Sequence, residues 1–372
     1  MKTSWKVGRI AGIDIRIDSS WLVVFFLVTM SLALFYFPHT YSDWTRWEYW
    51  SIGILTSLLF FASVLIHELA HSIVANKQKD RVRSITLFIF GGVSQISHEP
   101  ATPGKEFTMA IVGPLSSVGL GILFGFLWFL ARPVSMPFSA LFRYLSSINF
   151  VLAVFNLVPG FPLDGGRVLR SIVWRATGNL KAATRVASVS GQAVAWLLIF
   201  LGITLAIRGV LISGLWFAFI GWFLHSAAVR GYQQVVMREM LQDIRAEDLM
   251  SRDFETVGPD LTVEELISEH MLKKGKRTFL VEEGGRNVGI ICLEDVKSVP
   301  PELRTSKTVK EMMTPGSELR TVFPDDDGNV VMARLNEKDV HQVPVIDSGA
   351  LVGIVCRSDV IRHLQLRSEL GI

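Results

Sequence analysis

The stretch LIHELAHSIV at residues 65–74 follows directly on SIGILTSLLFFASV at residues 51–64. It sets two histidines and a glutamate at the end of a run that is apolar enough to enter a lipid bilayer. An ionisable side chain in hydrocarbon is costly unless it is paired, bound to a metal ion or facing a water-filled cavity. The stretch therefore predicts a functional site within the membrane.

The amino-acid composition indicates a membrane protein with a water-soluble tail. Of the 372 residues, 50% are hydrophobic and only 19% are charged, which is too apolar for an ordinary soluble enzyme. The apolar residues fill positions 19–228, whereas positions 229–372 hold ordinary mixtures of charged side chains. The net charge of +3, without a basic stripe interleaved with aromatics, argues against nucleic-acid binding. The only cysteines, Cys292 and Cys356, offer no disulfide framework and fit a reducing compartment.

Six windows that contain no Asp, Glu, Lys or Arg are long enough to cross a bilayer. They cover residues 19–38, 49–66, 107–131, 144–163, 186–207 and 209–228. The fourth window is expected to end near Pro159, because the sequence VPGFPLDGG cannot continue a helix. No small-residue cleavage site follows the first window, so we expect a retained helix and not a signal peptide.

Lysine and arginine are concentrated in alternate connections between these windows. The N-terminal tail and the loops after the second and fourth windows are rich in them, whereas the loops between are poor. By the positive-inside rule, we expect a multi-pass protein of the cell membrane with both termini in the cytoplasm. The HELAH end of the second window and the PLDGG end of the fourth window then lie on the same, cytoplasmic, side.

Two short segments of the membrane part favour β-structure. Residues 13–18, IDIRID, alternate with period two, and residues 84–97, SITLFIFGGVSQIS, are apolar but too short to cross a bilayer. The second segment is expected to form an interfacial strand or a re-entrant hairpin. Residues 1–230 are therefore predicted to be a polytopic α-helical membrane domain, with six transmembrane helices and a small membrane-associated β element.

His67 and His71 stand four residues apart, so both project from one face of a helix and can reach a single metal ion. Glu68 lies beside the pair, where it can take a proton from a metal-bound water without binding the metal. Zinc lowers the pKa of bound water to about 7 and polarises a carbonyl, as amide hydrolysis requires. A catalytic zinc needs a third protein ligand, and the candidate is Asp164 in FNLVPGFPLDGGR.

Several polar residues have plainer interpretations beside the functional one. Asp164 alone would most often be a turn residue next to glycines. Asn156 could cap a helix or hydrogen-bond between helices. His98 and His225 lack partners at ligand spacing and are expected to be structural or interfacial.

The tail contains an internal repeat of about sixty residues. FLVEEGGRNVGIICLEDV at 279–296 aligns with VPVIDSGALVGIVCRSDV at 343–360, an offset of 64 residues. The pattern resembles a tandem CBS-domain pair, a soluble α/β module in two copies. The copies are predicted at residues 247–305 and 306–367, after a linker at 231–246.

This resemblance implies that an adenosyl nucleotide binds between the two copies and regulates the attached enzyme or transporter. In the CBS pattern, a Ser or Thr and an Asp contact the nucleotide. Asp295 and Asp359 match the acidic position, whereas Cys292 and Cys356 stand in place of both hydroxyls. The alternative is a tail that only stabilises the chain or joins it into a homodimer.

HELAHS, GGVSQI, AIVGPLSS and NLVPGFPLDGGR, in this order and on these spans, resemble the site-2 protease family of intramembrane zinc metalloproteases, M50 type, in the subgroup with C-terminal CBS domains. The resemblance implies that His67, His71 and Asp164 bind one zinc ion. It also implies that Glu68 is the general base and that Asn156 lines the catalytic site.

In this family the GGVSQI segment is thought to offer a strand edge to the substrate. A transmembrane helix has all its amides bonded internally, so it must unwind before cleavage, and strand addition replaces the lost bonds. Gly91 and Gly92 allow close backbone approach. The predicted function is therefore regulated intramembrane proteolysis, in which a zinc endopeptidase cuts the transmembrane segment of a membrane-tethered protein. The alternative is a CBS-gated cation transporter or channel, with the same ionisable residues holding the transported ion.

Overall fold

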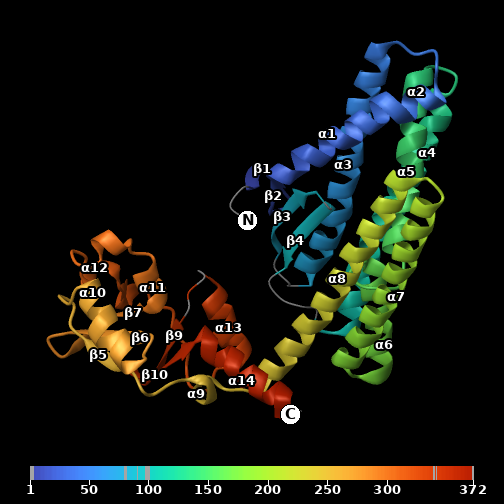
Figure 1. The fold of residues 1–372 in the computed structure, drawn as a ribbon. Coiled ribbons are helices and arrows are strands. Elements are labelled where there is room, and N and C mark those ends of the chain that lie inside the picture. Colours follow the sequence, from blue (N-terminus) through green and yellow to red (C-terminus); the bar gives the residue numbers. More distant parts are fainter. Residues whose placement is uncertain are drawn as a thin grey trace. The chain divides into compact units, whose positions relative to one another are not determined.

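The structure, a computed structural model, describes residues 4–78, 82–89, 91–96, 101–337, 340 and 342–370. The chain forms two compact units, residues 1–233 and 234–372 (Figure 1). The apolar windows fall in the first unit, and the internal repeat falls in the second.

Six helical segments of the described chain are long and apolar enough to cross a membrane. In the first, α1 (Ser19–Ser31) continues through a π-helical stretch (Leu32–Tyr36) into α2 (Phe37–Thr40). The other five are α3 (Arg46–Lys77), α4 (Pro103–Ala131), α5 (Met136–Asn156), α7 (Leu180–Ile207) and α8 (Leu211–Gln242). The predicted set of six membrane helices is confirmed, and α8 runs on into the segment expected to begin the linker.

Local sequence explains where the longest of these helices begin. Thr45 and Glu48 form a capping box at the start of α3, in which each side chain accepts a hydrogen bond from the other residue's backbone N–H. α5 begins at Met136, before the expected window, because Arg143 is tolerated within the helix. The Arg143 guanidinium lies 6.0 Å from the Trp128 ring centroid, which partners the charge.

The structure contains one helix of the membrane domain that the sequence analysis did not expect, α6 (Asp164–Thr177). Its charged and apolar residues alternate with the helical period, as in a helix lying along a polar–apolar boundary. It ends at Gly178, which adopts the left-handed conformation with φ of +68° that glycine allows without strain. Two glycines and a preceding proline at its start hide it from propensity reasoning.

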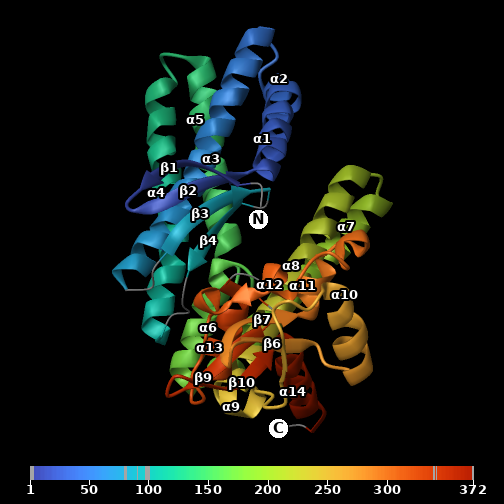
Figure 2. The same ribbon diagram turned by 90° about the vertical axis from the view of Figure 1, so that its left-hand side faces the viewer.

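A four-stranded sheet packs against α3 in the order β1 (Ser4–Ile10), β2 (Ile13–Asp18), β3 (Val82–Phe88) and β4 (Gly91–Ile96) (Figure 2). β2 and β3 are parallel, and the other two pairings are antiparallel. The strands expected at 13–18 and within 84–97 are thereby present, residue 97 lying outside the described residues. Ile13, Ile85, Leu69 and Met109 share a buried core that joins the sheet to α3 and α4.

Small side chains allow the membrane helices to approach closely. A Cβ atom added to Gly202 in α7 would lie 2.6 Å from the backbone nitrogen of Ala218 in α8. The hydroxyls of Thr29 in α1 and Ser57 in α3 are hydrogen-bonded at 2.9 Å. Such contacts replace the hydrophobic driving force that lipid does not provide between helices.

The second unit contains two sheets of related design. The first has the order β5 (Glu255–Val257), β6 (Thr278–Glu283), β7 (Arg286–Cys292) and β8 (Thr314–Pro315), and the second pairs β9 (Gln342–Asp347) with β10 (Ala350–Cys356). The principal helical segments are α9 (Ala246–Leu249), α10 (Val263–Glu265) with the π-helical stretch Leu266–Leu272, α11 (Leu293–Lys297), α12 (Val309–Met312), α13 (Gly328–Glu337) and α14 (Arg357–Leu370). The two copies of an α/β module are thus confirmed.

Each copy of the module receives its first short helix from the other copy's sequence. Leu249 of α9 packs in the core of the second copy with Val343 and Val355. Val309 of α12 packs in the core of the first copy with Phe279. The two lobes are therefore interlocked, although the repeat in the sequence reads as two consecutive blocks.

Candidate metal centre

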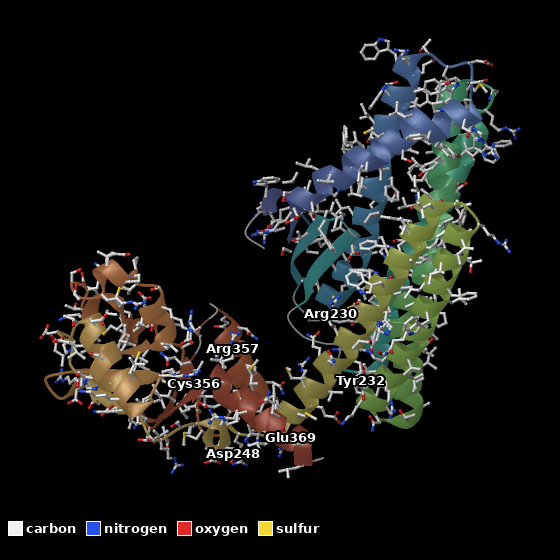
Figure 3. All side chains as sticks on the ribbon, viewed as in Figure 1. Arg230, Tyr232, Asp248, Cys356, Arg357 and Glu369 are labelled. Atoms are coloured by element: carbon white, nitrogen blue, oxygen red, sulfur yellow. The ribbon has the colours of Figure 1, made fainter. Side chains whose placement is uncertain are left out.

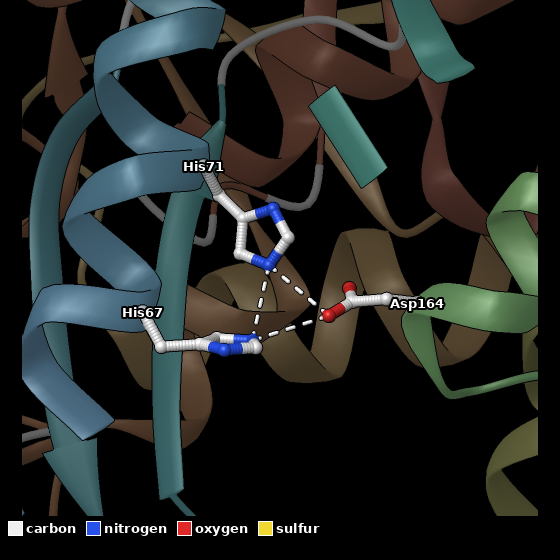
Figure 4. Close-up of side chains that lie close together, drawn as sticks. All are labelled: His67, His71 and Asp164. Atoms are coloured by element: carbon white, nitrogen blue, oxygen red, sulfur yellow. Dashed lines mark hydrogen bonds and ion pairs between the residues drawn. The ribbon is translucent and has the colours of Figure 1, made fainter. Parts of the chain in front are cut away.

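Three side chains of the predicted site converge at the cytoplasm-proximal part of α3 (Figure 4). The Nε2 atoms of His67 and His71 lie 3.2 Å apart, and Oδ2 of Asp164 lies 3.1 Å from each of them. Both histidines are buried, with exposed fractions of 5% and 7%. Residues about ninety positions apart in the sequence therefore present one nitrogen, one nitrogen and one oxygen to a common point.

The other ring nitrogen of each histidine is held by α4. Nδ1 of His71 lies 2.6 Å from the carbonyl oxygen of Met109, and Nδ1 of His67 lies 2.9 Å from Oγ of Ser117. A carbonyl only accepts, so Nδ1 of His71 carries the proton and Nε2 keeps its lone pair. This is the arrangement of metal-binding histidines, whose second nitrogen is usually anchored by a carbonyl or polar group.

The geometry of the three atoms fits a zinc ion. Ligand atoms bound to one tetrahedral zinc at the usual bond lengths stand about 3.4 Å apart, close to the separations observed here. The donor set of two imidazoles and one carboxylate is that of known catalytic zinc sites. Gly113 keeps the space beside the imidazoles clear, because a Cβ atom there would lie 2.1 Å from Nε2 of His71 and 2.7 Å from that of His67.

Asp164 reaches the histidines because the preceding loop packs tightly on α6 and α7. A Cβ on Gly165 would lie 2.3 Å from the carbonyl oxygen of Leu157, and one on Gly166 would lie 2.3 Å from the carbonyl carbon of Gly160. The glycines of PLDGG thus serve close backbone packing, which sets Asp164 as the first residue of α6.

The charge of Asp164 is stabilised by its neighbours. Burial alone would raise the pKa of this carboxyl, but the hydrogen bonds with His67 and His71 outweigh it and hold the pKa well below its ordinary value. The carboxylate is therefore ionised at neutral pH, which is the form that binds metal.

Glu68 and the strand β4 lie against each other. A Cβ atom added to Gly92 would lie 2.3 Å from Cγ and 3.1 Å from Oε1 of Glu68, which is half-buried. Gly91 has φ of +119°, a conformation that favours glycine. The candidate base and the candidate substrate strand of the sequence analysis are thus direct neighbours.

Asn156 is the last residue of α5 and is partly buried. It precedes the loop that leads to Asp164, but no hydrogen bond among the described residues joins it to the three converging side chains. His225 stacks edge-on with Trp196 at 5.5 Å between ring centroids, in keeping with a structural role, and His98 lies outside the described residues.

Sequence reasoning missed the residues of α4 that support the site. Met109, Gly113 and Ser117 recur every four residues, so they share one helix face, and this spacing within AIVGPLSS was the available signal. Pro114 lies between them and has no N–H, so its turn of α4 offers one donor fewer to the carbonyls.

In the second unit, Asp295 and Asp359 have equivalent positions. Oδ2 of Asp295 accepts a hydrogen bond from the Cys292 N–H at 2.8 Å, and Oδ2 of Asp359 accepts one from the Cys356 N–H at 3.2 Å. Each aspartate therefore caps the helix that follows its strand. Cys356 and Arg357 mark the junction of β10 and α14 in Figure 3.

Both thiols of this unit are held in the neutral form. Burial raises the pKa of Cys356 to about 11, and burial likewise raises the pKa of Cys292 far above its ordinary value. Thr278 Oγ1 lies 3.6 Å from Sγ of Cys356 and donates to Oε1 of Gln342 at 2.8 Å. Thr278 and Gln342 differ by the repeat offset, so the two copies meet through equivalent residues.

Comparison with known proteins gives matches over nearly the whole chain. The description "Peptidase family M50" matches residues 55–133 and 130–201, and "CBS domain" matches residues 246–302 and 309–366. A candidate zinc metalloprotease of Synechocystis is 35% identical, over 98% of this chain and 96% of its own length. The candidate zinc metalloprotease Rip3 of Mycobacterium tuberculosis is 33% identical, over 98% and 94%. The solved site-2 protease from Methanocaldococcus jannaschii is 25% identical, with a TM-score of 0.42 over 62% of this chain and 95% of that chain.

Proposed function

Because the chain belongs to peptidase family M50, as a multi-pass zinc metalloendopeptidase of the site-2 type with two CBS domains, we propose that it cuts other membrane proteins in or near their transmembrane segments. The proposed zinc ligands are His67, His71 and Asp164, and the proposed general base is Glu68. The convergence of the three ligand atoms, each about 3.1 Å from the next, is the observation that carries this assignment.

The side chains of the site have separate tasks in the proposed reaction. A zinc ion, when bound, supplies a water of lowered pKa and polarises the scissile carbonyl. Glu68 accepts the proton of the attacking water and delivers it to the leaving amine. Met109 and Ser117 hold the imidazoles of His71 and His67 in place through their Nδ1 atoms. Asp164 contributes the negative charge that compensates the cation.

The proposed binding mode is addition of the unwound substrate segment to β4. This strand is at the edge of the sheet, and no other strand of the described residues pairs with its free side. Gly92 lies against Glu68, so a peptide extended along β4 would pass next to the proposed base. Strand pairing would also satisfy the amides that the substrate helix loses on unwinding.

The function is tested with purified full-length protein in detergent micelles or vesicles. A panel of single-span peptides is incubated with and without a metal chelator, and the fragments are identified by mass spectrometry. We expect internal cleavage in or near the apolar segment, loss of cleavage with chelator and recovery when zinc is restored. Cleavage that is insensitive to chelator would contradict the metal mechanism.

The transporter or channel interpretation is not favoured. Relatives that cover nearly the whole chain carry zinc metalloprotease names, and the M50 match includes the HELAH helix. Glu68 also supports hydrolysis, because a carboxylate beside the ligand pair is needed for proton transfer and not for ion passage.

The proposed topology has both termini and the metal centre toward the cytoplasm of the cell membrane. His67 is 21 residues from the start of α3, or about 30 Å along the helix, which is the thickness of a bilayer core. At the other end, Tyr41, Trp44 and Tyr49 stack in an aromatic cluster typical of a membrane–water interface. This depth brings the centre near cytoplasmic water, which hydrolysis consumes.

The topology predicts different labelling of two exposed positions. In a chain with both native cysteines replaced by serine, Asp43→Cys should react with an impermeant thiol reagent in intact cells. Arg175→Cys should react only after the membrane is permeabilised. The opposite pattern would invert the orientation.

The proposed role of the CBS pair is regulation by an adenosyl nucleotide. Each of Asp295 and Asp359 follows a strand and has a second carboxylate oxygen for a ribose, beyond the one that caps its helix. The neutral Cys292 and Cys356 donate weaker hydrogen bonds than hydroxyls, so we expect modest affinity. Regulation requires that the nucleotide prefer one state of the enzyme over another.

We expect ATP, ADP or AMP to bind the full-length protein at millimolar concentration or below and to change the cleavage rate. Calorimetry measures binding and the peptide assay measures the rate. Asp295→Ala should weaken binding, whereas Asp325→Ala, which removes an exposed carboxylate of the same unit, should leave it unchanged. Absence of both heat and rate change would leave the tail a structural role.

A further inference from the structure

Glu106 and Arg170 form a buried ion pair between α4 and α6 that the proposed reaction does not use. Glu106 is 0% exposed and Arg170 is 6% exposed. Nε of Arg170 donates to Oε1 of Glu106 at 2.6 Å, and Nη2 of the same guanidinium donates to the same oxygen. A buried ion pair adds little stability over apolar residues of the same size, so its value lies in the orientation it enforces.

Arg170 also contacts the loop that precedes Asp164. The centre of its guanidinium lies 5.1 Å from the centroid of the Phe161 ring, a cation–π contact. Asp164 thus lies between two points held by the same side chain, Phe161 on one side and Arg170 on the other. The Arg170 side chain joins α4, the loop and α6.

The α4 side of this pair lies on the helix face that orients the histidines. Glu106 is three residues before Met109, whose carbonyl accepts from His71, and one further turn leads to Gly113. On α6, Asp164, Arg167 and Arg170 recur at three-residue intervals and form one ridge. Nε of Arg167 lies 3.8 Å from Oε1 of Glu106.

We propose that the Glu106–Arg170 pair is a positioning device for the third metal ligand. It sets the register of α6 on α4, so that Oδ2 of Asp164 meets both imidazole nitrogens. An apolar contact between two helices tolerates small sliding and rotation, whereas a guanidinium with two directed bonds to one oxygen does not. The inference rests on the proposed metal site and deepens it.

The test separates positioning from stability with an apolar replacement of the pair. Glu106→Leu combined with Arg170→Met removes both charges at similar volume, so the protein should remain folded. We expect zinc affinity, measured by chelator competition on the full-length protein, to fall about 10- to 100-fold, as for other outer contacts of metal ligands. The visible absorption of the cobalt-substituted protein should also change, because the oxygen ligand is displaced.

A matched control and a conservative variant complete the test. Thr29→Val breaks a buried hydrogen bond to α3 outside the site and should leave zinc affinity and the cobalt spectrum unchanged. Arg170→Lys keeps both charges but not the two-pronged geometry or the stacking, so it should weaken zinc binding and carries the test if the double variant does not fold.

The outcomes distinguish this inference from the function on which it rests. A folded double variant with the affinity and spectrum of the unaltered protein would overturn the positioning role alone. An unaltered protein that takes up no zinc in the same titration would overturn the metal site, and the positioning role with it.

Discussion

Glu68→Gln is expected to lower the cleavage rate by about 10²- to 10⁴-fold, the usual contribution of a general base, while zinc stays bound. Glutamine has nearly the same size as glutamate but cannot accept the proton of the attacking water. The three proposed ligands are untouched, so the metal content should remain that of the unaltered protein. Cleavage of a single-span peptide and metal analysis on the same preparation measure both quantities.

A carboxylate of the same helix provides the control for this variant. Glu48→Gln alters the cap at the other end of α3, far from the site, and should leave the cleavage rate close to normal. If Glu68→Gln cleaved at the unaltered rate, the assignment of the base would be wrong. If it lost zinc as well, Glu68 would have a structural or ligand role.

Asp164→Asn is expected to lower zinc affinity by more than the roughly 10- to 100-fold that loss of an outer contact costs. A neutral amide is a poorer ligand than a carboxylate and leaves the positive charge of the metal uncompensated. Cleavage should be lost at low zinc concentration and recover partly when zinc is added in excess. Chelator competition and a zinc titration of the cleavage rate measure these effects.

The control for this variant is Asp43→Asn in the exposed loop before α3, which should leave zinc affinity unchanged. Equal zinc affinity in Asp164→Asn and the unaltered protein would remove Asp164 from the ligands. That result would also remove the reason for the Glu106–Arg170 pair, which makes Asp164→Asn the first experiment to perform.

The sequence by itself determined the features that depend on neighbouring residues. The six apolar windows predict the membrane helices because crossing a bilayer requires a continuous apolar run. The four-residue spacing of His67 and His71 predicts their common helix face, because the helical period alone decides it. The repeat at an offset of 64 residues predicts two copies of one module, because duplication is visible without a structure.

The tertiary structure alone decided which distant residues meet. The contact of Asp164 with His71 spans 93 residues, and the pair of Glu106 with Arg170 spans 64. No local rule carries such distances, because they follow from the packing of α4 and α6 on α3. The helix α6 itself was hidden by its opening glycines, whose low helix propensity is overridden where a side chain would collide with the packed loop. The exchange of α9 and α12 between the two lobes likewise exists only in three dimensions, because a repeat in the sequence does not reveal which copy each short helix covers.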